Sequence, residues 1–261
     1  MKKTLRLIEL FIVLIISIII YKQTLYIIKD SDILMTELKS KEKEYYVHPQ
    51  NAIIKNETVI PGINGKKVDI EKTYKIIKKI KSINEKYIIY KEIPPQISLE
   101  NNKNKYIISG NNTKNEISII LEIDNNTNTG ELQKILKSNN IQITFQIDNE
   151  HNNIERLSKN KNYELENKNP TKANRICILD EPNEKILKLC SKQNKYTVIT
   201  NKIIKQSPFS EIKKILKPGL ILKIYANENT LNELDMTIKY IKSKGLNIKK
   251  ISDLISEKNN N

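Results

Sequence analysis

The hydrophobic pattern divides the chain into an apolar N-terminus and a longer part of mixed character. An almost unbroken apolar run extends from Leu10 to Tyr21 and follows three basic residues. This run is shorter than the roughly 20 residues of a full membrane span. Residues 24–28, TLYII, extend it if Lys22 directs its ammonium group towards the lipid headgroups. The pattern predicts a transmembrane helix within residues 1–28.

A secretory signal peptide is the alternative interpretation of this run, because its apolar core is also short. No small-x-small cleavage site follows Tyr21, which favours an uncleaved signal-anchor. Lys2, Lys3 and Arg6 precede the run, so the positive-inside rule places this end in the cytoplasm. We therefore expect a single-pass protein of the cell membrane with a cytoplasmic N-terminus and an extracytoplasmic C-terminal domain.

Two segments separate this helix from the rest of the chain. Residues 29–58 are rich in charged side chains and predict a partly helical stalk. Residues 59–112 predict a small leader segment that contains one helix and short strands. Its helix is indicated by four apolar side chains at near-helical spacing among lysines: Ile70, Tyr74, Ile77 and Ile80.

From residue 113 onwards, short apolar runs alternate with amphipathic segments. The expected strands are residues 117–124, 141–148, 175–180, 196–200 and 220–226. The expected helices are residues 129–140, 183–194, 209–219 and 230–245, before a last unit at 246–255. This alternation predicts an α/β domain over residues 113–256, built on a parallel sheet or a (β/α) barrel, with a disordered tail at 257–261.

Polar side chains mark the ends of the predicted strands. In parallel α/β folds the functional groups lie where the strands end. Four of the strands run into Asp124, Asp148, Asp180 and Tyr225, which we expect to lie at one edge of the sheet. The stretch IILEIDNN carries the first of them and continues with two amides.

Composition and charge add an expectation about location. The chain has 261 residues, 38% of them hydrophobic, and a net charge of +15. This charge suits anionic lipid or an anionic wall polymer, although an AT-rich genome gives the same excess of Lys, Asn and Ile at surface positions. No nucleic-acid-binding motif is present, so we expect no nucleic-acid partner. Cys177 lies in an apolar run and Cys190 on a predicted helix, which indicates two buried thiols rather than a disulfide.

The order of segments from residue 117 to 255 resembles the polysaccharide deacetylase (NodB-homology, carbohydrate esterase) family. It is most similar to membrane-anchored members from low-GC Gram-positive bacteria. GELQKILKSNNIQITFQID resembles the family's first helix and second strand. KPGLILKIYANENTLNELDMTIKYIKSKGLNIKKISDLI resembles its C-terminal end. The resemblance implies a distorted, truncated (β/α) barrel.

Family members are metal-dependent hydrolases that remove acetyl groups from cell-wall sugars. They bind a divalent cation through one Asp and two His, a second Asp is the general base, and a further His protonates the leaving group. By resemblance, Asp124 keeps the base position, while Asn125 replaces the metal-binding Asp. Lys168 and Lys172 stand at the two His positions, and Tyr225 stands in place of the leaving-group His.

These replacements predict a site without a metal. A protonated Lys has no lone pair with which to bind a cation. The chain contains only His48 and His151, and the first lies in the predicted stalk, so a two-His site within the domain is excluded. We expect no cofactor, with zinc or another divalent metal only if the protein is active. Lys168 or Lys172 is a candidate ion-pair partner for Asp124, the alternative being that both are solvated loop residues.

Three functions follow from these observations. The first is a membrane-tethered, non-catalytic deacetylase-like domain that binds or organises cell-wall glycan. The second is an active deacetylase with relocated ligands, namely His151 with Asp124, Asp148 or Glu150. The third is a basic envelope protein that binds anionic polymer or lipid, whose binding would fall steeply with salt.

Overall fold

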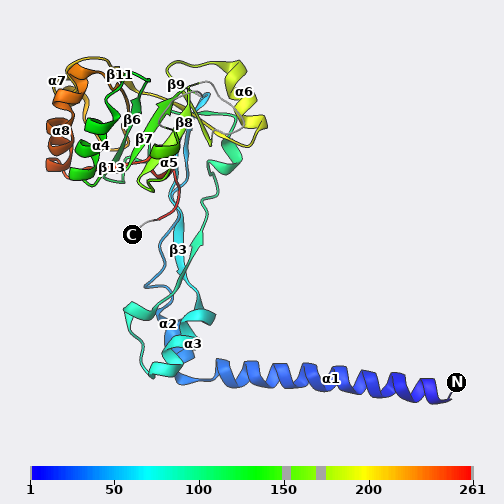
Figure 1. Ribbon diagram of the computed structural model, residues 1–261. Coiled ribbons are helices and arrows are strands. Elements are labelled where there is room, and N and C mark those ends of the chain that lie inside the picture. The colour runs from blue at the N-terminus through cyan, green and yellow to red at the C-terminus, as the bar shows by residue number, and fades with distance from the viewer. Residues whose placement is uncertain (1, 149–153, 169–174, 260–261) are drawn as a thin grey trace. The chain divides into compact units, whose positions relative to one another are not determined.

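The computed structural model describes residues 2–148, 154–168 and 175–259 (Figure 1). The chain forms two compact units, each of which is assembled from two stretches of sequence. Unit 1 comprises Met1–His48 and Gly65–Ile93. Unit 2 comprises Pro49–Asn64 and Pro94–Asn261. The predicted stalk and leader segment therefore each contribute residues to both units.

Unit 1 begins with the apolar helix α1 (Lys2–Asp30). The helix continues through Lys22, which confirms that residues 24–28 extend the apolar run. Its part Leu10–Asp30 is long and apolar enough to cross a membrane, a property that signal sequences near an N-terminus share. The remaining elements are α2 (Ile33–Lys41), β3 (Gly65–Val68), α3 (Ile70–Ile80), the 3-10 turn Glu85–Tyr87, and β4 (Tyr90–Ile93), which pairs antiparallel with β3.

A small apolar cluster holds α2 and α3 together. Its buried members are Met35, Leu38, Val68, Tyr74, Ile77 and Ile88. Helix α3 lies where the spacing of its apolar residues predicted it. Asp69 caps its start: the Asp69 carboxylate accepts a hydrogen bond from the Lys72 N–H at 3.1 Å and so satisfies a donor of the first turn. The short helical unit thus has both a core and a defined start.

Unit 2 contains most of the strands and helices. Its strands are β1 (Ile53–Lys55), β2 (Thr58–Ile60), β5 (Tyr106–Ile107), β6 (Glu116–Glu122), β7 (Ile143–Ile147), β8 (Tyr163–Asn167), β9 (Ile176–Leu179), β10 (Tyr196–Ile199), β11 (Lys202–Ile204), β12 (Ile221–Tyr225) and β13 (Asn247–Lys249). Its α-helices are α4 (Thr129–Ser138), α5 (Ile154–Ser158), α6 (Glu184–Lys192), α7 (Pro208–Ile215), α8 (Glu228–Ser243) and α9 (Ile251–Leu254), and Glu100–Asn102 forms a 3-10 turn. The alternation predicted from residue 113 is confirmed.

The strands form two sheets. One has the order β11-β12-β6-β7-β8, with β13 also paired to β6, and all of its pairs are parallel. The other has the order β1-β2-β5-β10-β9, in which only the β1-β2 hairpin is antiparallel. The predicted parallel arrangement is therefore confirmed. Strands β6, β7 and β12, which run into Asp124, Asp148 and Tyr225, end at one edge of the first sheet, whereas β9, which runs into Asp180, belongs to the second.

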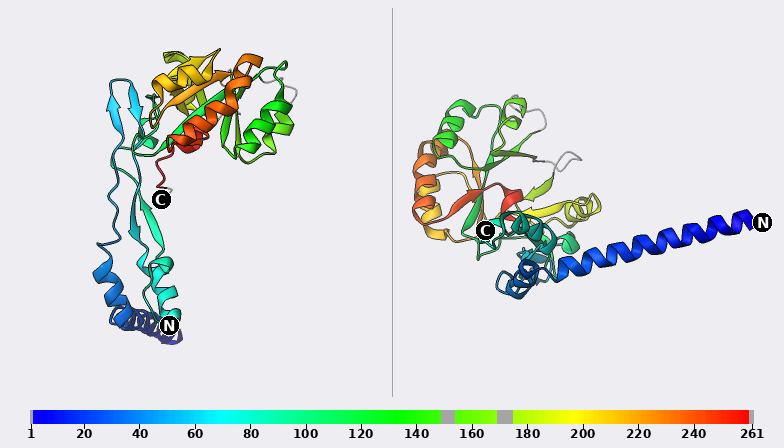
Figure 2. Two further views of the ribbon diagram at one scale, coloured as in Figure 1. Left: turned by 90° about the vertical axis from the view of Figure 1, so that its left-hand side faces the viewer. Right: turned by 90° about the horizontal axis from the view of Figure 1, so that it is seen from below.

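Alternate side chains of these strands enter two different cores. Ile119 and Leu121 of β6 pack beneath the helices, together with residues of α4 and α8, and Figure 2 shows α7 and α8 outside the strands. Ile120 faces the other way and joins Ile178 and Val198 of the second sheet. The space between the two sheets is thus the interior of a distorted (β/α) barrel, and the fold class expected from the resemblance is observed.

Strand β8 was not predicted. It lies in the stretch NYELENKNPTK, which was matched to the family's two-His motif. Glu164 and Glu166 are buried inside the barrel, although carboxylates in a strand normally mark a solvent-exposed face. The Glu166 carboxylate accepts hydrogen bonds from the N–H groups of Arg175 and Ile176, at 3.0 and 3.2 Å, and so links β8 to β9.

The prediction for the cysteines was wrong. Cys177 and Cys190 form a disulfide between β9 and α6, and both residues are buried. Cys177 alternates with the inward-facing residues of β9 and therefore points towards α6, which covers that side of the strand. Their separation of 13 residues gives no sign of this proximity, because it depends on how the helix folds back on the strand.

Candidate functional site

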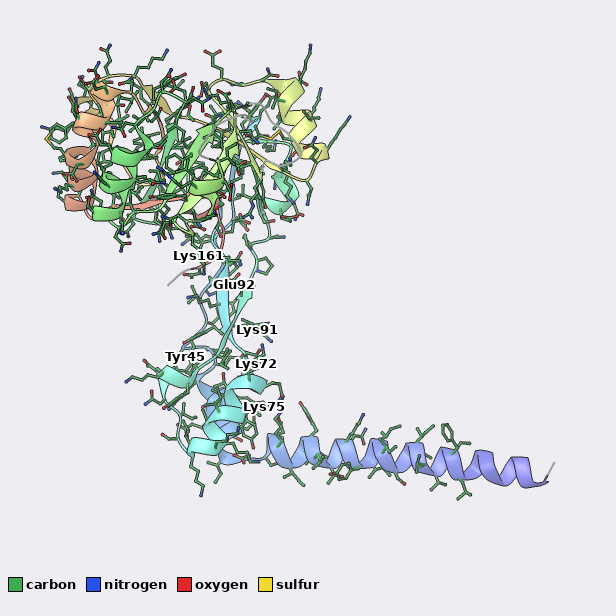
Figure 3. All side chains as sticks on the ribbon, in the orientation of Figure 1. Tyr45, Lys72, Lys75, Lys91, Glu92 and Lys161 are labelled. Atoms are coloured by element: carbon green, nitrogen blue, oxygen red, sulfur yellow. A yellow bond between two sulfur atoms is a disulfide. The ribbon has the colours of Figure 1, made fainter. Side chains whose placement is uncertain are left out.

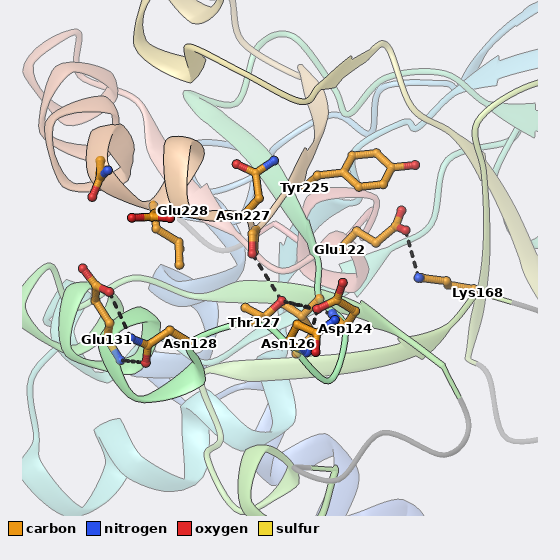
Figure 4. Close-up of a pocket in the computed structure, with 14 residues that line it drawn as sticks. Glu122, Asp124, Asn126, Thr127, Asn128, Glu131, Lys168, Tyr225, Asn227 and Glu228 are labelled. Atoms are coloured by element: carbon orange, nitrogen blue, oxygen red, sulfur yellow. Dashed lines mark hydrogen bonds and ion pairs between the residues drawn. The ribbon is translucent and has the colours of Figure 1, made fainter.

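A cavity of about 540 Å³ opens where β6 and β12 end (Figure 4). Asp124 and Tyr225, both predicted site residues, line it, and so does Lys168. The other lining groups are mostly carboxylates and amides: Glu122, Asn126, Asn128, Glu131, Asn227, Glu228 and Asn232. The structure therefore brings together three of the residues that the resemblance selected.

Asp124 is held in a tight loop that leads from β6 to α4. Its carboxylate accepts hydrogen bonds from the Asn126 N–H at 2.9 Å and from the Thr127 hydroxyl at 3.1 Å. The Thr127 hydroxyl also lies 3.2 Å from the Ala226 carbonyl oxygen, which connects this loop to the end of β12. The Asn128 side chain then caps α4 by accepting from the Glu131 N–H. The loop fixes the Asp124 carboxylate at the cavity wall.

A buried ion-pair cluster lies next to this loop and was not predicted. The Lys223 ammonium lies 2.7 Å from one Glu122 carboxylate oxygen and 2.9 Å from Asp180. Only 5% of the Lys223 side chain is exposed. Glu122 and Lys223 follow the inward-facing Ile120 and Ile221 on their strands, so strand alternation directs both charges into the barrel.

Lys168 joins the same cluster from the other side. Its ammonium lies 2.9 Å from the second Glu122 oxygen and 3.3 Å from Asp148, and 29% of its side chain is exposed. Glu122 thus lies between two lysines (Figure 4 draws its contact with Lys168). Asp148 and Asp180, predicted at this edge, take part through these contacts. The suggested pairing of Lys168 or Lys172 with Asp124 stays a prediction, and Lys172 lies outside the described residues.

Both lysines remain charged in this environment. Burial lowers the pKa of Lys168, but its hydrogen bonds and the charges of Glu122 and Asp148 outweigh burial, so the pKa is raised overall. The balance is the same for Lys223, where Glu122 and Asp180 raise the pKa against burial. Each side chain is therefore an ammonium ion at neutral pH, with no lone pair for a metal.

Tyr225 gives the cavity an aromatic wall. The ammonium groups of Lys205 and Lys223 lie 5.3 and 5.6 Å from the centre of its ring, within the range of cation–π contact. Burial raises the pKa of the Tyr225 hydroxyl, and the charge of Glu122 raises it further. At neutral pH this hydroxyl is therefore protonated, so it both donates and accepts hydrogen bonds.

The groups at the predicted ligand positions do not fit a divalent cation. Lys168 places a positive charge there, and Asn125 offers a neutral amide in place of a carboxylate. Within the part of the chain that the structure describes, no three His, Cys, Asp or Glu side chains are grouped as a metal site. Glu150 and His151 lie outside the described residues, and His48 belongs to unit 1.

The sequence contained one signal for the missed cluster. Glu122 and Lys223 each interrupt an apolar run that was itself predicted to be a strand. Charged side chains are rarely buried unless they are paired. Two opposite charges in two such strands therefore indicate an internal ion pair, once the strands are known to be neighbours.

No protein-family model matches the chain. Over 103 residues it is 37% identical to the uncharacterized protein YlxY of Bacillus subtilis (strain 168). The matched stretch is 39% of this chain and 32% of YlxY, so the chain spans about a third of that relative.

Solved structures match over more of the chain. BA3943, a pseudoenzyme of carbohydrate esterase family 4 (CE4) from Bacillus anthracis, covers 87% of this chain and 96% of its own, with 21% identity and a TM-score of 0.62. A BA3943 mutant with restored enzymatic activity covers 87% and 99%, with 22% identity and a TM-score of 0.60. At these identities the likeness shows the fold. The chain has the fold of the CE4 polysaccharide deacetylases, as the resemblance implied.

Proposed function

We propose that the protein is a membrane-anchored, extracytoplasmic relative of the polysaccharide deacetylases that binds cell-wall glycan without catalysis. The observation that carries this proposal is the Lys168 ammonium, which pairs with Glu122 and Asp148 at a position where the family binds its metal. Asp124 remains as the counterpart of the general base, and Tyr225 replaces the leaving-group His. The description of BA3943 as a pseudoenzyme with the same fold supports the proposal.

The contents of the cavity suit a sugar ligand. Carboxylates and amides supply both acceptors and donors for hydroxyl groups, and the Tyr225 ring supplies an apolar face. A volume of about 540 Å³ lies within the usual range for small-molecule sites. These features favour recognition of a short glycan segment, which needs neither a metal nor a reactive nucleophile.

One observation supports the uncleaved anchor and another supports the extracytoplasmic location. The end of α1 contributes to the fold of unit 1, since Lys29 pairs with Glu71 of α3, and Asp30 pairs with Lys39 of α2. A helix whose end is built into the unit suits an uncleaved anchor better than a removed signal peptide. The Cys177–Cys190 disulfide also suits an oxidising compartment outside the cytoplasm.

The deciding experiment combines metal titration with glycan binding on the full-length protein in detergent. We expect no stoichiometric zinc or cobalt, and saturable binding of an N-acetylglucosamine tetramer by calorimetry. Tyr225→Ala and Asp124→Ala should each weaken that binding about tenfold or more, the factor for a lost contact of about 1.4 kcal/mol. Tyr87→Ala removes an exposed ring of unit 1 and serves as the matched control.

Three other outcomes would contradict the proposal. One tightly held metal per chain, lost in Asp124→Ala or His151→Ala, would indicate a rebuilt catalytic site. Binding of polyglycerol phosphate that falls steeply with salt, without any glycan binding, would indicate a basic envelope protein. Equal weakening in Tyr225→Ala and Tyr87→Ala would show that the cavity is not the glycan site.

A further inference from the structure

Helix α3 of unit 1 presents a basic face opposite its packed face. Thr73, Tyr74 and Ile77 are buried, and the last two belong to the apolar cluster of the unit. Lys72, Lys75 and Lys79 project from the other side, within an arc of about 60° at 100° per residue. All three are exposed, and Figure 3 labels Lys72 and Lys75. We call Lys72, Lys75 and Lys79 the basic face.

Side-chain contacts attach α3 to the end of the apolar helix. Lys29 of α1 pairs with Glu71 of α3, and its ammonium lies 5.6 Å from the centre of the Tyr74 ring. The Tyr74 hydroxyl donates to Asp32 at 2.9 Å. Because the segment able to cross a membrane ends at Asp30, these contacts hold α3 close to the point where the chain leaves the bilayer.

Unit 1 also has exposed apolar side chains outside the basic face. Ile33, the first residue of α2, is 83% exposed, and Ile80 at the end of α3 is 40% exposed. Tyr87 and Tyr90 are exposed to about the same degree as Ile80. Lysines together with exposed Ile and Tyr side chains in one small unit suit a position near lipid headgroups.

We propose that the basic face of α3 binds the anionic phospholipid headgroups of the membrane that α1 spans. This inference rests on the membrane anchoring in the proposed function, but not on the glycan site. Electrostatic attraction to an anionic surface falls off within about 10 Å at 0.1 M salt. The contacts between α3 and the end of α1 place the basic face close enough to the membrane for that attraction. A lysine far from the end of α1 adds to the net charge of the chain but lies beyond this range.

The test uses the full-length protein in nanodiscs and the chemical reactivity of individual lysines. Nanodiscs of phosphatidylcholine are compared with nanodiscs that contain phosphatidylglycerol, and each lysine is followed by amine acylation and mass spectrometry. We expect the basic face to react about fivefold more slowly in the anionic discs, the factor that corresponds to about 1 kcal/mol per lysine. High salt should restore the rates. Three exposed lysines of α6 are the internal control: Lys185, Lys188 and Lys192.

Variants separate charge from accessibility. We expect the neighbouring Lys78 and Lys81 also to react more slowly in the anionic discs. Replacing the basic face by Lys72→Gln, Lys75→Gln and Lys79→Gln together should remove this protection. The matched triple variant of the α6 lysines should leave it unchanged. Both triple variants change only exposed side chains, so the fold of each unit is retained.

Several outcomes would overturn the inference. The basic face could react at the same rate in both lipids, or the α6 lysines could be protected equally, which would indicate adsorption of the whole chain. Stronger protection by soluble polyglycerol phosphate in neutral discs would assign the face to a wall polymer. Co-migration of the protein with the discs reports on anchoring by α1 separately, so failure of the anchor is distinguished from failure of this surface.

Discussion

The inward-facing side of the barrel strands differs between its two ends. Ile120, Ile178 and Ile221 form part of an apolar cluster in the interior. Two residues further along the same strands, Glu122, Asp180 and Lys223 form an ion-pair cluster. The alternation of side chains is the same at both ends, but the chemistry changes from burial of methyl groups to pairing of charges. We call these the apolar end and the charged end.

The two ends teach different lessons about tolerance to mutation. When a buried apolar side chain is replaced by a smaller one, the protein loses only the stability that came from burying the removed atoms. A buried charge that loses its partner keeps the full cost of its own dehydration. The charged end should therefore be the more sensitive, and it is also the end that carries the cavity. Four variants test this comparison, from the largest expected effect to the smallest.

Lys223→Met should destabilise the protein most. The substitution leaves Glu122 and Asp180 facing each other without the ammonium, and loss of one partner of a buried pair costs about 3–5 kcal/mol. The free energy of unfolding is measured by thermal and urea unfolding of the full-length protein, followed by circular dichroism.

The matched control for Lys223→Met also removes the charge of its partner. Lys223→Met combined with Glu122→Gln should recover part of the loss, because the two substitutions interact through the same contact. A loss below about 1 kcal/mol in Lys223→Met, or no recovery in the double variant, would contradict the view that the ammonium holds this end together.

Glu166 should make stability depend on pH. Burial, together with the charge of the neighbouring Glu164, raises the pKa of this carboxyl from 4.5 to about 8. The folded state binds the proton more tightly than the unfolded state, so stability is full below pH 4.5 and is lost as the pH rises towards 8. The expected slope is about 1.4 kcal/mol per pH unit at most.

Glu166→Gln is the control for this pH dependence, since an amide does not titrate. The slope of unfolding free energy against pH between 5 and 8, measured by urea unfolding in a series of buffers, should decrease in this variant. An unchanged slope would mean that other groups produce it.

Ile221→Val tests the apolar end. It removes one buried methyl group from the interior and should cost about 1 kcal/mol, within the range of 0.5–1.5 found for this substitution. The cost should be the same at every pH, because no titrating group is changed. The same unfolding series measures it, and a cost equal to that of Lys223→Met would erase the distinction between the two ends.

Much of the fold could be predicted from the sequence. Strands β6, β7 and β12 are apolar runs that end at turn signals, and α3, α4 and α8 show apolar residues at helical spacing. These signals are local, so they survive in a single sequence. Strand β8 was missed because its inward face carries Glu164 and Glu166, whose burial depends on partners that only the folded chain supplies.

The candidate site could be predicted only in part. Asp124 and Tyr225 were found because each directly follows or ends an apolar run. The pairing of Lys223 with Glu122 joins residues about a hundred positions apart, and the disulfide depends on α6 folding back on β9. Such contacts depend on strand order and on helix packing, which hydrophobic periodicity does not determine.

Lys168→Gln is the sharpest test of the charged end, because it removes the other lysine that contacts Glu122. Its ammonium is more exposed than that of Lys223, so water replaces much of the lost contact and the expected cost is about 1 kcal/mol or less. Thermal unfolding of Lys168→Gln and of Lys223→Gln compares the stability lost when each lysine that contacts the Glu122 carboxylate is replaced. If the two variants lost equal stability, the difference in burial between the two lysines would have no effect. Lys168 at the cavity would then stabilise the protein as much as Lys223 in the interior.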